Sequence, residues 1–342
     1  MASRQASPGS LRLLVPLMAG VLLLEVGFIA SYAGALHNVD LHPLKVQVVA
    51  TQAQTEALKA GLTSAHAPVN VQQATSAAAA ERALRQGKVF GVFEPGPSSA
   101  QLLVSSASGP AAVEVLTTVF GRVADTLHVP LVTHDLVPLR TGDPRGLVPF
   151  YLVIGWVFGG YLAATILGLL RGMTPGFPAA AARRLAGLAA YAIASGLVGV
   201  AVVDAGYGYL VGHPWSTVAI GALVVFAVAA ATAALESVLG LVGTGLTIIL
   251  FVLLGNPSAG GPWPTELIAS PWRQIGPWLP NGAGLTAIRK AVYFGAHGIG
   301  PPLFVLAVYA IVGGAATLAL SRRSRPFINI EADTSPEPVL PC

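Results

Sequence analysis

Carboxylates inside apolar stretches are the side chains of this sequence with the clearest chemical potential. Glu25 lies in the middle of an apolar run over 13–36. An unpaired carboxylate there costs about 2.5–3.5 kcal/mol in hydrocarbon. Glu25 is therefore expected to face the protein interior or a cavity, or to be protonated, as a candidate intramembrane polar site; a hydrogen bond to a neighbouring helix is the structural alternative. Asp204 and Glu236 lie near the ends of other apolar runs, and their side chains are expected to reach the interface.

A second polar element is LPNGAGLTAIRKAVYFG at 279–295, between two long apolar runs. Pro280 and Asn281 are typical of a helix start, and the cations Arg289 and Lys290 follow on an otherwise apolar helix. Backbone that enters a membrane without crossing it must satisfy its polar groups within protein or a wet cavity. We expect a re-entrant element at the outer end of the membrane region. The alternative is an amphipathic helix lying on the outer leaflet, anchored by nearby tryptophans.

Signatures of enzymes and of cofactor sites are missing from the sequence. It contains no GxSxG, HExxH or CxxC motif and no glycine-rich phosphate loop after a strand. His37, Asp40 and His42 lie close together in HNVDLH, where a solvated linker is the expected structure. The single cysteine, Cys342, allows no disulfide within the chain. We therefore expect no catalytic residue, no cofactor and no metal site, and the chain is not expected to be an enzyme.

The composition is that of an integral membrane protein. Apolar residues make up 54% of the 342, charged residues 10%, and the mean hydropathy is +0.69. A single helix over 217–255 would be about 58 Å long, nearly twice the thickness of the hydrocarbon core, so a helical hairpin is expected there. The sequence thus predicts a polytopic α-helical membrane protein with six transmembrane helices, at 13–36, 148–170, 185–206, 217–236, 238–255 and 302–320.

A different kind of sequence lies between the first two spans. Residues 37–147 alternate short β-branched runs with alanine-rich helical stretches, in the order βαβαββαβ. About 110 residues are enough for a small α/β domain with its own core. The expected architecture is therefore one span, an inserted α/β domain, and a five-helix membrane domain at 148–320 that includes an outer loop at 256–301.

The distribution of arginine predicts the orientation. Short flanks that would lie on one side of the membrane hold Arg4, Arg12, Arg171, Arg183, Arg184, Arg322, Arg323 and Arg325. The loop at 207–216 on the other side has no Lys or Arg, and the loop at 256–301 has three. By the positive-inside rule, the N-terminus (1–12) and the tail (321–342) are cytoplasmic and the α/β domain is extracytoplasmic. The net charge of +4 follows from this topology, so nucleic acid is not an expected partner.

Three segments carry a resemblance to a known family. SAAAAERALRQGKVFGVFEPG resembles part of the outer domain of ABC-2 type permeases, DPRGLVPFYLVIGWVFGGYL resembles the entry to their second span, and LPNGAGLTAIRKAVYFG resembles the polar piece before their last one. The layout is most similar to the phage-infection-protein-like branch. The resemblance implies a permease subunit in a bacterial cell membrane that pairs as a homodimer or heterodimer and exports a hydrophobic or amphipathic substrate.

Energy for such export would come from a separate ATP-binding subunit, because the chain has no GxxxxGK[ST] motif. The segment RGMTPGFPAAAARR at 171–184 resembles the coupling helix that contacts this subunit. Its candidate residues are Pro178, Arg183 and Arg184, on a short helix expected at 178–184; the alternative is that the arginines only enforce topology. The alternative function is a non-transporting membrane anchor that presents the α/β domain to a partner.

Overall fold

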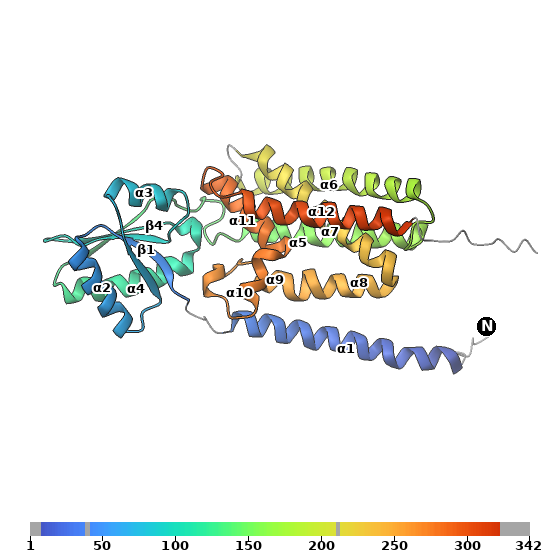
Figure 1. Ribbon diagram of the computed structural model, residues 1–342, viewed down its shortest axis with the longest axis horizontal. Helices are drawn as coiled ribbons and strands as arrows, with labels where there is room; N and C mark the ends of the chain where they lie inside the picture. Colours follow the sequence, from blue (N-terminus) through green and yellow to red (C-terminus); the bar gives the residue numbers. More distant parts are fainter. Residues whose placement is uncertain (1–7, 38–41, 210–212, 322–342) are drawn as a thin grey trace, which may run out of the picture.

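The chain forms a helical region with an α/β domain at one end (Figure 1). The computed structural model describes residues 8–37, 42–209 and 213–321. The first helix begins, and the last helix ends, at the end of the bundle away from the α/β domain (Figure 1). We call this the distal end, and the opposite end the domain end.

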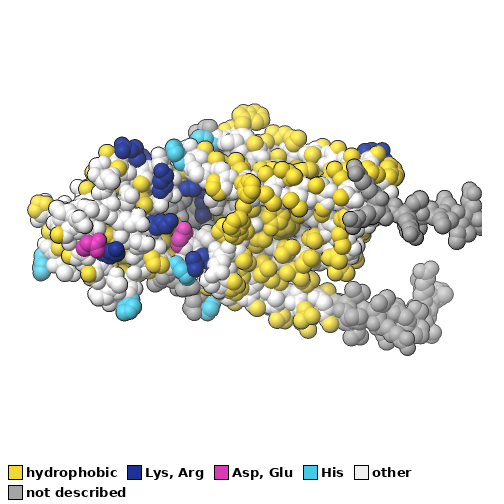
Figure 2. All heavy atoms as spheres, viewed as in Figure 1, with side chains coloured by type: hydrophobic (Ala, Val, Ile, Leu, Met, Phe, Trp, Pro, Cys, Tyr) yellow, Lys and Arg dark blue, Asp and Glu magenta, His cyan; other side chains and the backbone are white. Residues whose placement is uncertain are grey.

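Within the described residues, six helical segments are long and apolar enough to cross a membrane, as the sequence predicts. Exposed apolar side chains cover much of the visible face of the helical region (Figure 2), which fits a polytopic helical membrane protein. The fifth segment consists of α8 (Leu241–Thr247), a π-helix (Ile248–Leu254) and α9 (Gly255–Ser258). The other five are α1 (Pro8–Leu36), α5 (Val148–Arg171), α6 (Pro178–Tyr207), α7 (Pro214–Leu239) and α12 (Gly300–Ser321).

The expected hairpin within 217–255 is present. The chain turns between α7 and α8 at Gly240, whose φ of 58° lies in the region that favours glycine. The helix α7 is the centre of the bundle and packs against α5, α6 and α12. Trp156 of α5 fits between α6 and α7, because Gly199 and Gly221 leave room for its indole ring, and its Nε1 donates to the Ser195 carbonyl at 3.1 Å.

The helix α1 lies at the edge of the bundle and is the least buried of the six segments. It packs against the π-helix and α9. The Ser31 hydroxyl donates to the Leu253 carbonyl at 2.6 Å, and the Trp272 indole N–H donates to Ser31 at 2.8 Å. This contact therefore attaches α1 near the domain end and leaves most side chains of 18–30 exposed.

The α/β domain has the order of elements that the sequence predicts. Its five strands form a sheet in the order β2-β1-β3-β4-β5, in which only the β3–β4 pair is antiparallel. The helices α2 and α4 cover one face and α3 covers the other (Figure 1). The elements are β1 (Leu44–Val48), α2 (Gln52–Ser64), β2 (Val69–Gln73), α3 (Ala77–Arg85), β3 (Gly91–Glu94), β4 (Ala100–Val104), α4 (Pro110–Thr126) and β5 (Leu131–Asp135).

The segment between the fifth and sixth spans folds back against the bundle. It contains α10 (Trp272–Ile275) and α11 (Pro280–Tyr293). The helix α11 packs against α5, α7 and α12, and its apolar side chains Leu285, Ile288 and Val292 belong to the core of the bundle. The apolar side of α11 therefore contacts helices of the same chain.

Candidate functional site

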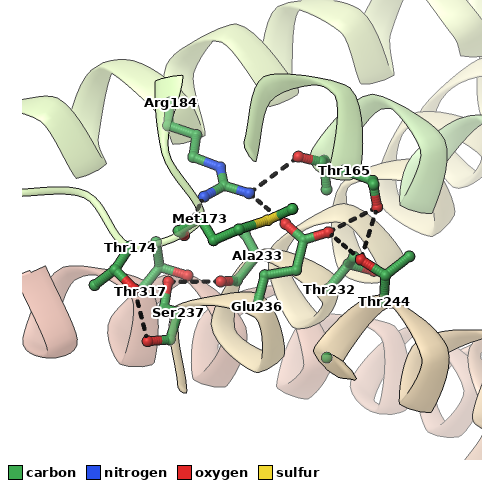
Figure 3. A network of polar contacts seen from close by, with 12 residues as sticks. Thr165, Met173, Thr174, Arg184, Thr232, Ala233, Glu236, Ser237, Thr244 and Thr317 are labelled. Atoms are coloured by element: carbon green, nitrogen blue, oxygen red, sulfur yellow. Dashed lines mark hydrogen bonds and ion pairs between the residues drawn. The ribbon is translucent and has the colours of Figure 1, made fainter. Parts of the chain in front are cut away.

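A buried ion pair lies within the bundle near its distal end (Figure 3). The Arg184 Nη2 atom of α6 is 2.6 Å from the Glu236 Oε2 atom of α7, and these side chains are 4% and 0% exposed. Burying two charges carries a large desolvation penalty, which is offset only when both are paired and hydrogen-bonded. The pair is therefore the most demanding electrostatic feature among the described residues, and we treat it as the candidate functional site.

Two threonines complete the environment of the carboxylate. Glu236 Oε1 accepts hydrogen bonds from Thr165 of α5 at 2.7 Å and from Thr244 of α8 at 2.8 Å. The two hydroxyl oxygens are themselves 3.4 Å apart (Figure 3). Both carboxylate oxygens thus have donors, and these donors come from three helices other than α7.

Backbone carbonyls surround the guanidinium. Arg184 donates to the carbonyl of Met173 at 2.8 Å and to that of Ala164 at 3.0 Å, while its buried Nε has no partner. A Cβ on Gly168 would lie 2.9 Å from Glu236 Oε2 and 3.1 Å from Arg184 Nη2, so glycine is what lets α5 approach the pair. Arg184 consequently fixes the segment 172–177, which we call the inner loop, to the bundle.

The structure corrects two expectations about these residues. Glu236 does not reach the interface: it is fully buried under α5, α6 and α8, although it lies close to the end of α7. Arg184 is not on a separate short helix, because α6 runs without a break from Pro178 to Tyr207. Arg183, one position earlier, is exposed, and its guanidinium lies 5.5 Å from the centre of the Phe177 ring. Helix periodicity explains the difference, since adjacent residues point about 100° apart.

Glu25 is not where the sequence led us to expect it. The residue is exposed on α1, and it has no hydrogen-bond or ion-pair partner within residues 8–37, 42–209 and 213–321. It therefore faces neither the interior nor a cavity of this single chain. The sequence holds no signal for this outcome, because an acid in an apolar run has the same pattern whichever side of the helix is packed.

The beginning of α11 is buried at a polar junction. Pro280 and Asn281 are the first residues of the helix, and Asn281 is 1% exposed. Its Nδ2 donates to the Phe251 carbonyl of the π-helix at 2.8 Å and to the Asn256 side chain at 2.7 Å. The amide therefore satisfies backbone that the irregular fifth segment leaves open.

Arg289 lies at the other end of α11 and is held by carbonyl groups. Its guanidinium donates to Gly260 at 2.8 Å, to Gly261 at 3.2 Å and to Gly146 at 3.4 Å. Burial lowers the pKa of this guanidinium from its ordinary value, and the side chains of Tyr209, Tyr293, Asp143 and Glu266 partly oppose that shift. Arg289 thus connects α11 to the segment after α9 and to the residues that precede α5.

Lys290 connects the bundle to the α/β domain. Its ammonium group donates to the carbonyls of Gly87 at 2.9 Å and Gln86 at 3.3 Å, at the end of α3, and lies 5.0 Å from the centre of the Phe294 ring. Burial lowers the pKa of Lys290, while Glu266 acts in the opposite direction. Lys290 therefore stabilises the contact between α11 and the α/β domain, whereas Arg289 binds next to the bundle.

Metal binding has no support in the described part of the chain. Within it, no group of three or more His, Cys, Asp or Glu side chains is arranged to hold a metal ion. Of the residues that the sequence places together, His37 contacts the Ala33 carbonyl at 2.8 Å, and Asp40 lies outside the described residues.

The site consists of two opposite charges, and the described groups that contact them include no nucleophile with an adjacent base. Its partners are threonine hydroxyls and backbone carbonyls, which orient the two charged groups. Through these hydrogen bonds and the ion pair, the site holds together α5, α6, α7, α8 and the inner loop. Comparison of the chain with models of protein families, with curated proteins and with solved structures finds no match.

Proposed function

We propose that this chain is the membrane permease subunit of an ABC-2 type export system, which moves a hydrophobic or amphipathic substrate outward with energy from a separate ATP-binding subunit. The observation that carries the proposal is the Arg184–Glu236 pair, which fixes the inner loop to four helices at the distal end. A force applied to this loop would move the bundle as a unit, which is what coupling to an external ATPase requires.

The surface beside the pair supplies the contact for that subunit. Phe177 and Arg183 are exposed at the start of α6, and Arg171 is exposed at the end of α5. Pro178 begins α6 and ends the inner loop. Two cations and an aromatic ring form a surface suited to an acidic groove, while Arg184 holds the loop from the inside. The two arginines thus have different functions: Arg183 contacts the partner and Arg184 transmits the movement.

The orientation of the chain follows the same proposal. Both termini are cytoplasmic, the distal end faces the cytoplasm of a bacterial cell, and the α/β domain and a re-entrant α11 lie on the outer side. The exposed arginines of the distal end support this orientation. Glu25 supports pairing with a second permease chain, because a carboxylate left in lipid is costly and a partner helix would cover it.

Co-purification with an ATPase tests the proposal. The full chain, tagged and extracted from its native membrane in mild detergent, is expected to retain an ATP-binding protein and to stimulate ATP hydrolysis by that protein. Arg183→Glu should reduce both by about tenfold, and Arg82→Glu on the α/β domain, also an exposed arginine, should reduce neither. Recovery of a folded chain with no associated ATP hydrolysis would contradict the proposal.

The alternative is a non-transporting anchor that presents the α/β domain to a partner. A cavity between α2, α4 and the sheet of this domain favours it, since a binding domain needs no coupling surface. Substitutions at the distal end distinguish the two functions. An anchor would keep its partner after Arg183→Glu, whereas an exporter would lose substrate movement in proteoliposomes.

A further inference from the structure

The α/β domain contains a cavity that is separate from the ion pair and the inner loop at the distal end. Its volume is about 620 Å³, which lies within the range of about 300–1,000 Å³ typical of sites for small molecules. It is located between α2, α4 and the sheet. Its lining includes Val48, Ala57, Leu58, Gly61, Phe93 and Arg122.

The position of the cavity in the sheet is that of a ligand site. From β1 the chain passes to β2 on one side of the sheet and then returns to β3 on the other side, so the connections diverge between β1 and β3. In open α/β sheets, ligands bind outside the carboxyl ends of the strands at such a switch point. Val48 ends β1, and Phe93 and Pro95 lie at the end of β3, so one end of the cavity reaches this point. Its other end is lined by His66, Ala67 and Pro68, which directly precede β2.

The face of α2 that borders the cavity keeps it open. Residues 54, 57, 58, 61 and 65 follow helical spacing along one side of α2, and three of them are Ala57, Gly61 and Ala65. A Cβ added to Gly61 would meet nothing within 4 Å. The space is therefore available to a ligand instead of being filled by larger side chains of the domain's own core.

The chemistry of the lining defines the ligand. Most of the lining is aliphatic, and no acidic side chain borders the cavity in the described structure. Arg122 of α4 is the guanidinium at its edge, is exposed, and has no ion pair or side-chain hydrogen bond within the described residues. We propose that this cavity binds a single-chain amphiphile, with its aliphatic chain against α2 and the sheet and its anionic head group, a carboxylate or a phosphate, on Arg122.

Binding is measured with the full chain in phosphatidylcholine nanodiscs, and empty nanodiscs correct for partition into lipid. The probe is tritiated dodecanoate in a scintillation proximity assay. We expect saturable binding that dodecyl phosphate displaces, whereas dodecanol and dodecyltrimethylammonium displace it at least tenfold more weakly. Dodecanoate and dodecyl phosphate compared in competition identify which anionic head group is preferred. Each methylene added from octanoate to dodecanoate should strengthen binding about fourfold.

Two pairs of variants connect the binding to the cavity. Gly61→Leu should abolish saturable binding, because the new side chain occupies the space beside α2; Gly121→Leu on α4, outside the lining and also with an open Cβ position, should leave it unchanged. Arg122→Gln should weaken binding about tenfold, and Arg82→Gln on α3 should not. Arg122 and Arg82 are both exposed, so replacing them is not expected to disturb folding. The arginine variants therefore test the site even if a glycine variant does not fold.

Three results would overturn this assignment. The first is binding no greater than that of empty nanodiscs, the second is full binding by both Gly61→Leu and Arg122→Gln, and the third is equal displacement by dodecanol and dodecyl phosphate. None of these results bears on ATP hydrolysis, so the export function and the cavity can fail separately.

Discussion

The two ends of the helical bundle each hold an arginine, which is buried at the distal end and half-buried at the domain end, and its charge has different partners at the two ends. At the distal end Arg184 is paired with the Glu236 carboxylate at 2.6 Å. At the domain end Arg289 donates to backbone carbonyls, of which the nearest is Gly260 at 2.8 Å, and no carboxylate lies within 4 Å of it among the described residues. Arg184 thus contacts a full opposite charge, whereas Arg289 contacts carbonyl dipoles and the carboxylates of Asp143 and Glu266 act on it from a greater distance.

This difference determines which groups lose their partner when the arginine is replaced. Loss of Arg184 would leave a buried carboxylate without its counter-ion, which is strongly unfavourable in a medium of low dielectric constant. Loss of Arg289 would leave unpaired carbonyls, for which the desolvation penalty is smaller. Removal of either partner is therefore expected to destabilise the distal end strongly. At the domain end, stability is expected to fall gradually as single hydrogen bonds are lost.

The largest effect is expected for Arg184→Met. The free energy of unfolding should fall by about 3–5 kcal/mol, because Glu236 stays buried and unpaired. The double variant Arg184→Met with Glu236→Leu should recover most of this loss, since it removes both charges and keeps an apolar core. Denaturant titration in detergent micelles measures both. A double variant no more stable than the single one would show that the pair does not act as a unit.

An intermediate effect is expected for Arg289→Met. Three carbonyls lose a charged donor, and the free energy of unfolding should fall by about 1.5–3 kcal/mol. Arg289→Lys, which keeps the charge but not the planar fork, should recover only part of this loss. The same titration applies, and a loss as large as that of Arg184→Met would break the distinction between the two ends.

Lys290→Met should have a smaller and local effect. We expect a loss of about 0.5–1.5 kcal/mol in the free energy of unfolding, together with faster amide exchange at the end of α3, where Gln86 and Gly87 accept hydrogen bonds from Lys290. Hydrogen–deuterium exchange with mass spectrometry detects this. Unchanged exchange around 84–90 would mean that Lys290 does not hold the α/β domain against α11.

The smallest effect is expected for Glu25→Gln, which serves as a baseline for both ends. Glu25 is exposed on α1 and has no partner in the described chain, so the free energy of unfolding of the monomer should change by less than about 0.5 kcal/mol. Glu236→Gln in the same assay should be far more damaging, because it leaves Arg184 buried without a counter-ion. A large loss with Glu25→Gln in a monomeric preparation would show that α1 packs more closely than its exposure indicates.

Local patterns were sufficient for the elements of this protein. The order of strands and helices between 37 and 147, the six apolar segments and the turn near Gly240 all follow from periodicity, apolar length and glycine, which act over a few residues. The helix at Pro280 was also predicted, although its burial beneath α5, α7 and α12 was not. One boundary was wrong: a short helix at 178–184 and a span at 185–206 were expected, and α6 runs without a break from Pro178 to Tyr207.

The candidate site was predicted only in part, and the two intramembrane acids show why. From the sequence Glu25 is the stronger candidate because it is farther from the ends of its run, yet it is exposed and Glu236 is buried. The partner of Glu236 lies 52 residues earlier in the chain. Hydropathy gives the depth of a residue along a helix, and it does not give the direction in which the side chain points relative to other helices.

By itself the sequence determined that the chain consists of six apolar helices with an α/β domain after the first, because the lengths and periods of apolar residues fix secondary structure locally. Only the tertiary structure decided that Arg184 faces inward while Arg183 faces outward, and that Arg184 and Glu236 meet. The rotation of each helix about its axis follows from packing against its neighbours, and that rotation sets which charges are paired.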